Sequence, residues 1–245
     1  MPSPAASNNR RVACEWCGMR RICFPARVAS IGAKRSDTTP IRRMRVERGA
    51  TLYRAGDKVH SLYVLRSGCI KEIEWTHRKR EAVMGFTLPG ELLTVQYAGG
   101  VPSRTTSIAL ETSFICAIPW RSLHRWNADA RIVSSELVAR IAEATAAARQ
   151  LVIMIRDKEA LERVAGFLLN IAARLQSRSR PGSEFRLGMS RDDIANYLGL
   201  RSETVSRCFS ELVLHKLITA HGKRVAVLQP AELQRVFAGG NSDEP

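Results

Sequence analysis

The sequence predicts an α+β protein built from an N-terminal β-roll, a long helix and a C-terminal winged helix-turn-helix. Residues 44–120 consist of short apolar runs interrupted by glycines, which is typical of the short strands of a roll or barrel. Residues 129–156 carry a continuous helical repeat of apolar side chains. Residues 190–228 fit two short helices followed by a β-hairpin. We therefore expect a cysteine-containing segment 1–36, a roll 37–128, a helix 129–156 and a winged helix-turn-helix domain 157–240.

The composition points to a polyanionic partner. In 245 residues, 38 Lys and Arg outweigh 23 Asp and Glu, so the net charge is +15 and the pI is about 10.3. Nucleic acid is the usual partner of such a chain, although charge that serves solubility alone is the alternative. No apolar run is long enough to span a membrane, and the first 17 residues lack the apolar stretch of a signal peptide. We therefore expect a cytoplasmic protein, in which the six cysteines serve as thiols, ligands or core residues rather than disulfides.

The roll is expected from five segments of short apolar runs. They are TLYRAGD (51–57), SLYVLRSG (61–68), CIKEIEW (69–75), AVMGFTLPGELL (82–93) and SIALETSFICAIPW (107–120). The preceding residues 1–36 show no sustained period of strand or helix. That segment should be ordered only where something ties it down.

The long helix carries a heptad seam that favours a homodimer. The seam residues follow one another at steps of 4, 3, 4, 3 and 4, the spacing that pairs two helices. They are Leu137, Ile141, Ala144, Ala148, Leu151 and Ile155. The alternative is an amphipathic helix that packs on the roll of its own chain, because two and a half heptads make a short seam.

Local signals mark the helices that follow. Residues 158–176 predict a helix with Leu161, Val164, Leu168, Ala172 and Leu175 on one face, and residues 177–185 (SRSRPGSEF) predict a loop. Ser190 is expected to cap the first helix of the helix-turn-helix together with Asp193. Gly199 should supply the turn, and Ser202 should cap the second helix.

This second helix has an apolar back and a polar front. The back consists of Val205, Cys208, Phe209 and Leu212, and the front of Glu203, Ser206, Arg207 and Ser210. Such a helix can enter the major groove of double-stranded DNA. There Arg207 can fork onto guanine N7 and O6, Glu203 can accept from a cytosine amino group, and Ser206 can contact a base or a phosphate. The alternative is a generic three-helix bundle with a solvated polar face.

Further DNA contacts are expected from the flanks of this helix. Ser202, Ser210 and Arg191 complete the predicted contact set on the helix-turn-helix. Residues 217–228 (LITAHGKRVAVL) predict a β-hairpin with a basic tip from His221 to Arg224. This hairpin is placed as a wing, from which Lys223 can reach a phosphate.

The order of these elements resembles the cyclic-AMP-receptor/FNR superfamily of transcription regulators, over essentially the whole chain. ETVSR (203–207) resembles the E-x-x-S-R reading motif of the FNR branch, and TLYRAGD and SLYVLRSG resemble the first strands of the family's cyclic-nucleotide-binding-like roll. The resemblance implies a homodimer on a palindrome of TTGAT-like half-sites, acting as activator or repressor. The basic turn THRKRE (76–81) matches a loop that contacts RNA polymerase in relatives, and a plain exposed hairpin tip is the alternative.

Four cysteines form a candidate metal or cluster site. Cys14, Cys17 and Cys23 have the spacing C-x2-C-x5-C, and Cys116 lies far downstream. Four thiolates suit a tetrahedral zinc ion or an iron-sulfur cubane equally well, so the spacing alone leaves both open. A fourth ligand from another domain would make the order of the N-terminal segment depend on the metal centre.

The oxygen-sensing branch of the family has similar cysteines, within segments like ICFP (22–25) and ALETSFIC (109–116). The resemblance implies a 4Fe-4S cluster on Cys14, Cys17, Cys23 and Cys116, which oxygen degrades, shifting the dimer toward monomer. Arg20, Arg21 and Arg27 can offset the negative charge of the cluster or form a solvated basic tail. Cys69 and Cys208 lack the spacing and are expected to be small core residues, Cys69 in a strand and Cys208 on the inward face of its helix.

Rival interpretations are a zinc-based or thiol-based redox regulator on the same scaffold and an iron-sulfur redox enzyme. An enzyme is disfavoured, because the sequence has no G-x-G-x-x-G after a strand, no P-loop and no credible catalytic set. A cyclic nucleotide is unlikely: relatives that bind it carry an Arg-Ser or Arg-Thr pair, and the matching register reads Thr106-Ser107, with Arg104 close by. The seam has Ala148 where the oxygen-sensing branch often has an acidic residue, so we expect the cluster-free form to dimerise more readily.

Overall fold

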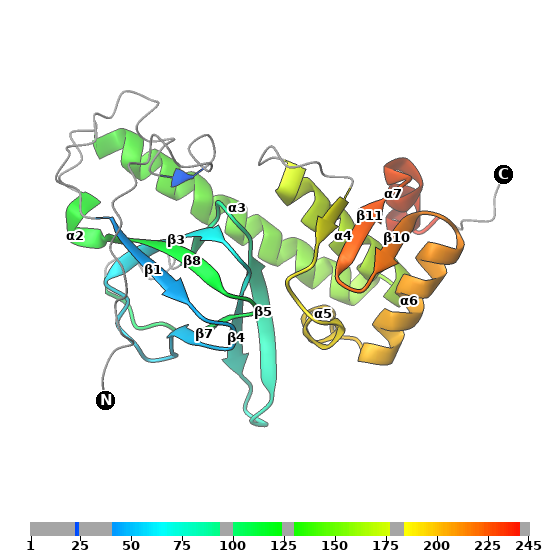
Figure 1. The fold of residues 1–245 in the computed structure, drawn as a ribbon, viewed down its shortest axis with the longest axis horizontal. Coiled ribbons are helices and arrows are strands. Elements are labelled where there is room, and N and C mark those ends of the chain that lie inside the picture. Colours follow the sequence, from blue (N-terminus) through cyan, green and yellow to red (C-terminus); the bar gives the residue numbers. More distant parts are fainter. Residues whose placement is uncertain (1–22, 25–40, 94–99, 124–129, 177–183, 241–245) are drawn as a thin grey trace. The chain divides into compact units, whose positions relative to one another are not determined.

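The computed structural model describes residues 23–24, 41–93, 100–123, 130–176 and 184–240 (Figure 1). The chain divides into two compact units, Met1–Ala144 and Thr145–Pro245. The boundary falls inside α3 (Ala130–Asp157), which contributes turns to both units. Within the described residues, no helix combines the length and the apolar character that crossing a bilayer requires.

The first unit contains two four-stranded sheets, and all of their strand pairs are antiparallel. One sheet has the order β1-β8-β3-β6, with β1 (Arg42–Val46), β8 (Ser113–Pro119), β3 (Ser61–Ser67) and β6 (Leu92–Leu93). The other has the order β2-β7-β4-β5, with β2 (Thr51–Tyr53), β7 (Thr106–Ala109), β4 (Ile70–Trp75) and β5 (Glu81–Thr87). The short helix α2 (Trp120–Leu123) follows β8. The predicted roll is therefore confirmed (Figure 1).

Two apolar clusters hold the roll together, one on each face of the sheet that contains β3 and β8. The first joins the two sheets through Val46, Leu65, Ile70, Leu93, Ala109 and Ile115. The second contains Leu62, Val64 and Ile118, and adds Cys23 and Phe24 from the N-terminal segment. Leu137 of α3 packs against this second cluster. Because burial of each large apolar side chain contributes roughly 1.5–3 kcal/mol, this face holds Phe24 and Leu137 against the roll.

The turn between β3 and β4 requires glycine. Gly68 has a φ of +102°, in the region that side chains disfavour, and a Cβ there would lie 2.2 Å from Oγ of Ser113. The close approach of this turn to Ser113 brings β8 against β3. Any other residue at this position would push the two strands apart.

A polar network lies inside the roll, around Glu72 of β4. The hydroxyls of Tyr53 and Thr105 both donate to Oε1 of Glu72. Ser107 stands directly opposite Glu72 in the β4–β7 register, and its buried hydroxyl has no hydrogen-bond partner among the described residues. Burial raises the pKa of Glu72, and the hydrogen bonds from Tyr53 and Thr105 oppose that rise without cancelling it. The folded roll therefore disfavours the ionised carboxylate.

We expect Glu72→Gln to stabilise the roll at neutral pH, because the amide can accept the same two hydrogen bonds without burying a charge. Since the pKa of Glu72 is raised in the folded state, the wild type loses stability as the pH rises from the ordinary glutamate pKa through the folded value. Thermal unfolding of the two proteins from pH 4 to 8 should show a gap that opens with rising pH. Glu74→Gln in the same strand is the control, and an equal gap for that variant would contradict the account.

In its described residues, the second unit carries a three-stranded sheet of order β10-β11-β9, the last turns of α3 and four further helices. Its elements are α4 (Ala160–Gln176), β9 (Glu184–Arg186), α5 (Arg191–Leu198), α6 (Ser202–Leu214), β10 (Ile218–His221), β11 (Arg224–Val227) and α7 (Pro230–Ala238). The predicted helices and hairpin are confirmed (Figure 1). The loop predicted over 177–185 is wrong at its end, because Glu184 and Phe185 belong to β9. Phe185 pairs with Val225 of the distant hairpin, a long-range contact that local turn residues do not reveal.

Helix α4 is the scaffold on which the helix-turn-helix rests. It buries one complete face, and Gly166 lets α7 approach closely, since a Cβ there would lie 2.6 Å from the ring of Phe237. Arg163 of α4 donates from Nε to the carbonyl of Lys158 at 2.7 Å and from Nη1 to the carbonyl of Leu198 at 3.2 Å. The second of these bonds satisfies a carbonyl at the C-terminal end of α5 and so fixes that end on α4.

Candidate functional site

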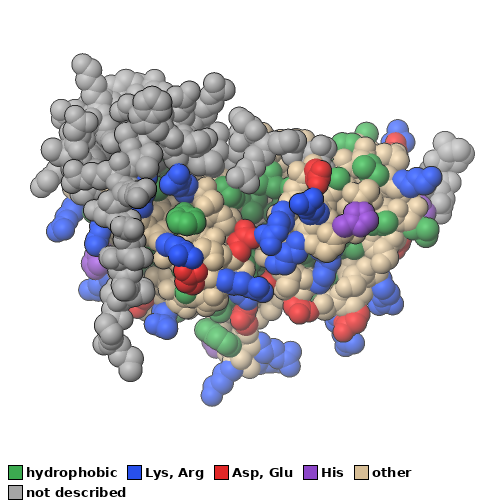
Figure 2. Space-filling view, in the orientation of Figure 1, with side chains coloured by type: hydrophobic (Ala, Val, Ile, Leu, Met, Phe, Trp, Pro, Cys, Tyr) green, Lys and Arg blue, Asp and Glu red, His purple; other side chains and the backbone are tan. Residues whose placement is uncertain are grey.

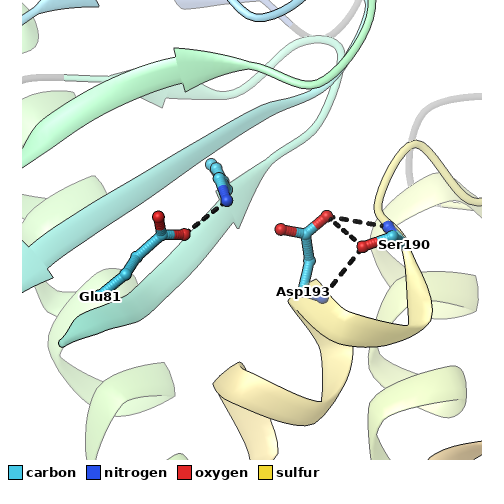
Figure 3. Close-up of polar contacts among 4 residues, drawn as sticks. Glu81, Ser190 and Asp193 are labelled. Atoms are coloured by element: carbon cyan, nitrogen blue, oxygen red, sulfur yellow. Dashed lines mark hydrogen bonds and ion pairs between the residues drawn. The ribbon is translucent and has the colours of Figure 1, made fainter. Parts of the chain in front are cut away.

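A reciprocal hydrogen-bonded cap fixes the start of α5 (Figure 3). The backbone N–H of Asp193 donates to Oγ of Ser190 at 3.1 Å, and the backbone N–H of Ser190 donates to Oδ2 of Asp193 at 2.9 Å. At the other end, Gly199 adopts the left-handed conformation with a φ of 66°. The predicted cap and turn are therefore confirmed, and they set the angle at which α6 leaves α5.

The predicted cap of α6 by Ser202 is wrong. The N-cap is Arg201, whose backbone is extended with φ −90° and ψ 151°, and no side chain caps the helix. Ser202 is already the first helical residue, so its side chain is not placed to bond the N–H groups of the first turn. It stands instead at the N-terminal end of α6, where a helix attracts anions.

The two faces of α6 have the predicted burial. Val205, Cys208, Phe209 and Leu212 are buried, and Glu203, Ser206, Arg207 and Ser210 are exposed. Ser210 donates its hydroxyl to the carbonyl of Ser206 at 3.1 Å, so it is the least available of the four for a base. Within the described residues, Glu203 and Arg207 form no ion pair with each other or with any neighbour. Their side chains can therefore meet DNA without first breaking a contact.

The wing is tied to the start of the helix-turn-helix. His221 and Arg224 face each other at the end of the hairpin and are both exposed. Lys223 donates from Nζ to the carbonyl of Gly188 at 2.7 Å, and its own carbonyl accepts from the N–H of Leu187 at 2.8 Å. Lys223 therefore holds the wing against the segment that precedes α5, while His221 and Arg224 are the residues presented at its tip.

Arg191, the first residue of α5, lies against the ring of Phe209 in α6. Its Cζ is 3.4 Å from the ring centroid. Burial lowers the pKa of the Arg191 guanidinium. Figure 2 shows further Lys and Arg side chains over the described surface of the face drawn, interspersed with acidic ones. The excess positive charge is therefore not confined to the helix-turn-helix.

The structure brings two of the four candidate cysteine ligands into one apolar cluster. Cys116, in β8, packs against the buried cluster that contains Cys23 and Phe24. Cys14 and Cys17 lie outside the described residues, as do Arg20, Arg21 and Arg27. Among the residues that the structure describes, no group of three or more His, Cys, Asp or Glu side chains lies close enough to hold a metal ion.

The remaining two cysteines have the surroundings of core residues. Cys208 is buried under α6, and this burial, together with Glu211, raises the pKa of its thiol. Cys69 is buried in the turn just before β4, not inside a strand as predicted. A thiol with a raised pKa is a weaker ligand, so Cys208 is poorly suited to a metal centre.

Helix α3 exposes a stripe of apolar side chains that differs slightly from the predicted seam. Leu137 packs on the roll, and Leu151 and Ile155 are half-buried, whereas Ile141, Ala144 and Ala148 are exposed. Two β-branched residues outside the predicted seam are among the most exposed apolar side chains, Val138 at 63% and Val152 at 56%. Because apolar residues are adjacent at 137–138 and at 151–152, the sequence allows a seam through Leu137 and Leu151 or one through Val138 and Val152. Only the burial of these side chains distinguishes the two seams.

The hairpin between β4 and β5 presents an exposed basic tip. The tip residues from His77 to Arg80 are exposed, and so is Trp75 at the end of β4, at 58%. An ion pair between Lys71, near the start of β4, and Glu81, the first residue of β5, ties the two strands together (Figure 3). This arrangement fits a solvated tip and a contact surface equally well.

Two family models match the chain, and together they span most of it. The cyclic nucleotide-binding domain matches residues 43–127, and the Crp-like helix-turn-helix domain matches residues 162–236. The transcriptional activator protein Anr of Pseudomonas protegens is 33% identical over 228 residues, which cover 93% of this chain and 93% of that protein. The fumarate and nitrate reduction regulatory protein of Vibrio cholerae is 30% identical over 223 residues, covering 91% of this chain and 89% of that protein.

Solved structures agree on the fold. FixK2 from Bradyrhizobium japonicum superposes with a TM-score of 0.73 at 23% identity, over 84% of this chain and 100% of that one. A CRP-family regulator of Thermus thermophilus, TTHB099, superposes with a TM-score of 0.60 at 22% identity. With relatives above 30% identity along nearly the whole chain, these matches define a family of regulators and not of enzymes. The chain therefore belongs to the cyclic-AMP-receptor/FNR superfamily, as an FNR-type transcription regulator that carries its DNA-binding helix-turn-helix at the C-terminal end.

Proposed function

We propose that this regulator responds to oxygen through a 4Fe-4S cluster on Cys14, Cys17, Cys23 and Cys116, and binds palindromic TTGAT-like DNA as a cytoplasmic homodimer. The observation that carries the proposal is the convergence of Cys23 and Cys116 on one apolar cluster that also contacts α3. One relative is named a transcriptional activator and the other a regulator of fumarate and nitrate reduction, and both names support a role in anaerobic gene control, as activator or repressor.

The chemistry of the two described ligands fits such a cluster. Both are sulfur donors, which favour iron-sulfur centres and zinc over hard cations. Their neighbours in the apolar cluster are Phe24, Leu62 and Val64. An apolar setting of this kind limits water access to an inorganic centre. Zinc on the same four thiolates is the alternative, and metal analysis separates the two.

The residues around the cysteines can couple the iron-sulfur cluster to α3. When bound, this iron-sulfur cluster would supply an oxygen-sensitive link between the N-terminal segment and β8. Phe24 and Leu137 pack in the same apolar cluster, so any displacement of Cys23 changes the surface on which α3 rests. Cluster loss then removes a support of α3, and the population shifts toward a state in which the helix pairs less well.

Pairing of α3 with a second copy would cover its exposed apolar stripe. The exposed side chains favour a seam with heptad steps of 3, 4, 3 and 4, which consists of Val138, Ile141, Thr145, Ala148 and Val152. This seam shares Ile141 and Ala148 with the one predicted from the sequence. The other predicted members, Leu137, Ala144, Leu151 and Ile155, flank this stripe. Small and β-branched residues at these positions suit close helix packing.

We expect Val152→Asp to separate the dimer, because it places two like charges opposite each other in an apolar seam. Sedimentation of the cluster-loaded protein under nitrogen should then show monomer at micromolar concentration. The cluster-free wild type, with Ala148 in the seam, should remain partly dimeric under the same conditions. A matched control is Arg149→Asp, on an exposed position outside the seam. A dimer that survives Val152→Asp would exclude this seam.

The other surfaces have roles that follow from the same assignment. Glu203, Ser206 and Arg207 read bases, and Ser202 and Arg191 with the wing contact the flanking backbone. The tip from His77 to Arg80 is the candidate contact with RNA polymerase. A cyclic nucleotide remains an unlikely ligand, since the hydroxyl of Thr105 is engaged by Glu72 and Arg104 is exposed.

Metal analysis under nitrogen tests the proposal directly. We expect a brown protein with broad visible absorbance and about four irons per chain, bound to a duplex that contains two TTGAT half-sites. Exposure to air should remove the colour, raise the fraction of monomer and lower the affinity for the duplex. A colourless protein that contains zinc, or an affinity for the duplex that air leaves unchanged, would refute oxygen sensing.

A further inference from the structure

The stacked pair of Arg191 and Phe209 connects the two helices of the helix-turn-helix. Arg191 begins α5, and Phe209 lies in the middle of α6 (Figure 1). The 3.4 Å from Cζ of Arg191 to the ring centroid is van der Waals contact over the ring face. Phe209 is only 4% exposed, and the guanidinium of Arg191 covers the face of its ring that the core does not bury.

The guanidinium of Arg191 is held but not neutralised. Within the described part of the chain it takes part in no ion pair and no hydrogen bond, and the ring of Phe209 is its one recorded partner. The neighbouring carboxylate of Asp193 is already engaged in the helix cap with Ser190. A half-buried cation with several unused N–H donors in one plane matches the oxygen atoms of a phosphate.

We propose that Phe209 is a positioning residue for DNA binding, whose ring fixes the guanidinium of Arg191 in place to receive a backbone phosphate. This inference rests on the DNA-binding role of α5 and α6. The ring limits the freedom of a long side chain before DNA arrives, so less conformational entropy is lost on binding. The capping box at Ser190 fixes the backbone of Arg191, and Phe209 fixes the other end of the side chain.

A purely structural role would give a different result. If Arg191 only shields the apolar edge of Phe209, its loss lowers the stability of the domain but leaves the salt dependence of DNA binding unchanged. If the pair presents a phosphate ligand, loss of Arg191 lowers the magnitude of the slope of log Kd against log salt. Each lost phosphate contact should change that slope by about 0.9, or roughly 2 for a dimer.

The test is a double-mutant cycle on the full-length chain under nitrogen, with a TTGAT palindrome and a scrambled duplex of equal length. We expect Arg191→Ala to weaken binding to both duplexes and to lower the salt slope. Phe209→Leu, which keeps an apolar side chain but removes the ring, should weaken binding roughly two- to fivefold per subunit. Phe209→Tyr should bind like the wild type, and Phe209→Leu should have no further effect once Arg191 is alanine.

Arg191→Lys protects the experiment against a folding defect, because it leaves Phe209 and the core untouched. Lysine keeps the charge but lacks the flat stacking surface, so we expect most of the salt slope to remain while affinity falls. The inference would be overturned if the Arg191→Lys variant bound DNA with the affinity of the wild type. It would also be overturned if Phe209→Leu still weakened binding in the Arg191→Ala background. If the wild type bound the scrambled duplex and not the palindrome, the proposed half-site would be refuted. The affinities of the variants for the scrambled duplex would still test the role of Phe209.

Discussion

Cys116→Ser is expected to yield a protein that holds no four-iron cluster under nitrogen and whose DNA affinity no longer responds to air. Cys116 is the one candidate ligand that lies in the roll, in the middle of β8 between Arg43 of β1 and Val64 of β3. The other three precede it by more than ninety residues. A serine hydroxyl is a hard and weakly acidic donor that does not replace a thiolate on iron. Loss of this sulfur should therefore remove the proposed iron-sulfur link between the N-terminal segment and the roll and leave the apolar packing of Phe24 in place.

The same replacement at Cys69 provides the matched control. Cys69 is more deeply buried than Cys116, so Cys69→Ser should cost at least as much packing energy. We nevertheless expect it to retain about four irons and the visible absorbance. Iron and sulfide content, absorbance and sedimentation of both variants separate ligation from stability. A full cluster in the Cys116→Ser protein would show that the fourth ligand lies elsewhere.

Coupling to α3 can be followed in the same samples. Leu137 contacts the apolar cluster around Cys23, and the exposed stripe of α3 begins at the next residue, Val138. A change in this apolar cluster should therefore act on α3 at the point where its exposed stripe begins. Cys116→Ser should for this reason lower the dimer fraction under nitrogen to the level of the cluster-free wild type.

Local signals in the sequence were sufficient for the helix-turn-helix. The pair Ser190 and Asp193 and the turn at Gly199 are recognisable because each satisfies backbone groups within three or four residues. The burial of Val205 and Leu212 follows from the helical period alone. Ser202 shows the limit of such signals, because the cap is decided by which residue adopts an extended backbone, and here Arg201 does.

Contacts between distant residues could not be derived in this way. Lys223 bonds the carbonyl of Gly188, 35 positions away, and β9 exists only because Phe185 pairs with the hairpin. The seam of α3 was ambiguous for the same reason, since packing of Leu137 on the roll decides which neighbouring register stays exposed. The proximity of Cys23 and Cys116 likewise depends on packing of Cys23 and Phe24 on the roll, and the resemblance to a family anticipated it where the spacing could not.

Arg207→Ala is expected to remove roughly 1–3 kcal/mol of discrimination at one base pair of each half-site. Arg207 lies on the exposed front of α6 and has no ion-pair partner within the described residues. Its planar guanidinium can form two hydrogen bonds to guanine N7 and O6, which no other base presents together. Substitution of that guanine should therefore cost the wild type affinity and leave the variant nearly unaffected.

Two further variants separate base reading from attraction to the backbone. Arg224→Ala, at the exposed tip of the wing, should weaken binding to all duplexes alike and lower the salt slope. Ser210→Ala should have little effect, because the hydroxyl of Ser210 is bonded to the carbonyl of Ser206. Competition binding with duplexes substituted at each position of the half-site distinguishes these patterns. If Arg207→Ala weakens binding equally at every position, Arg207 acts on phosphates, and sequence recognition must come from Glu203, Ser206 or the shape of the DNA.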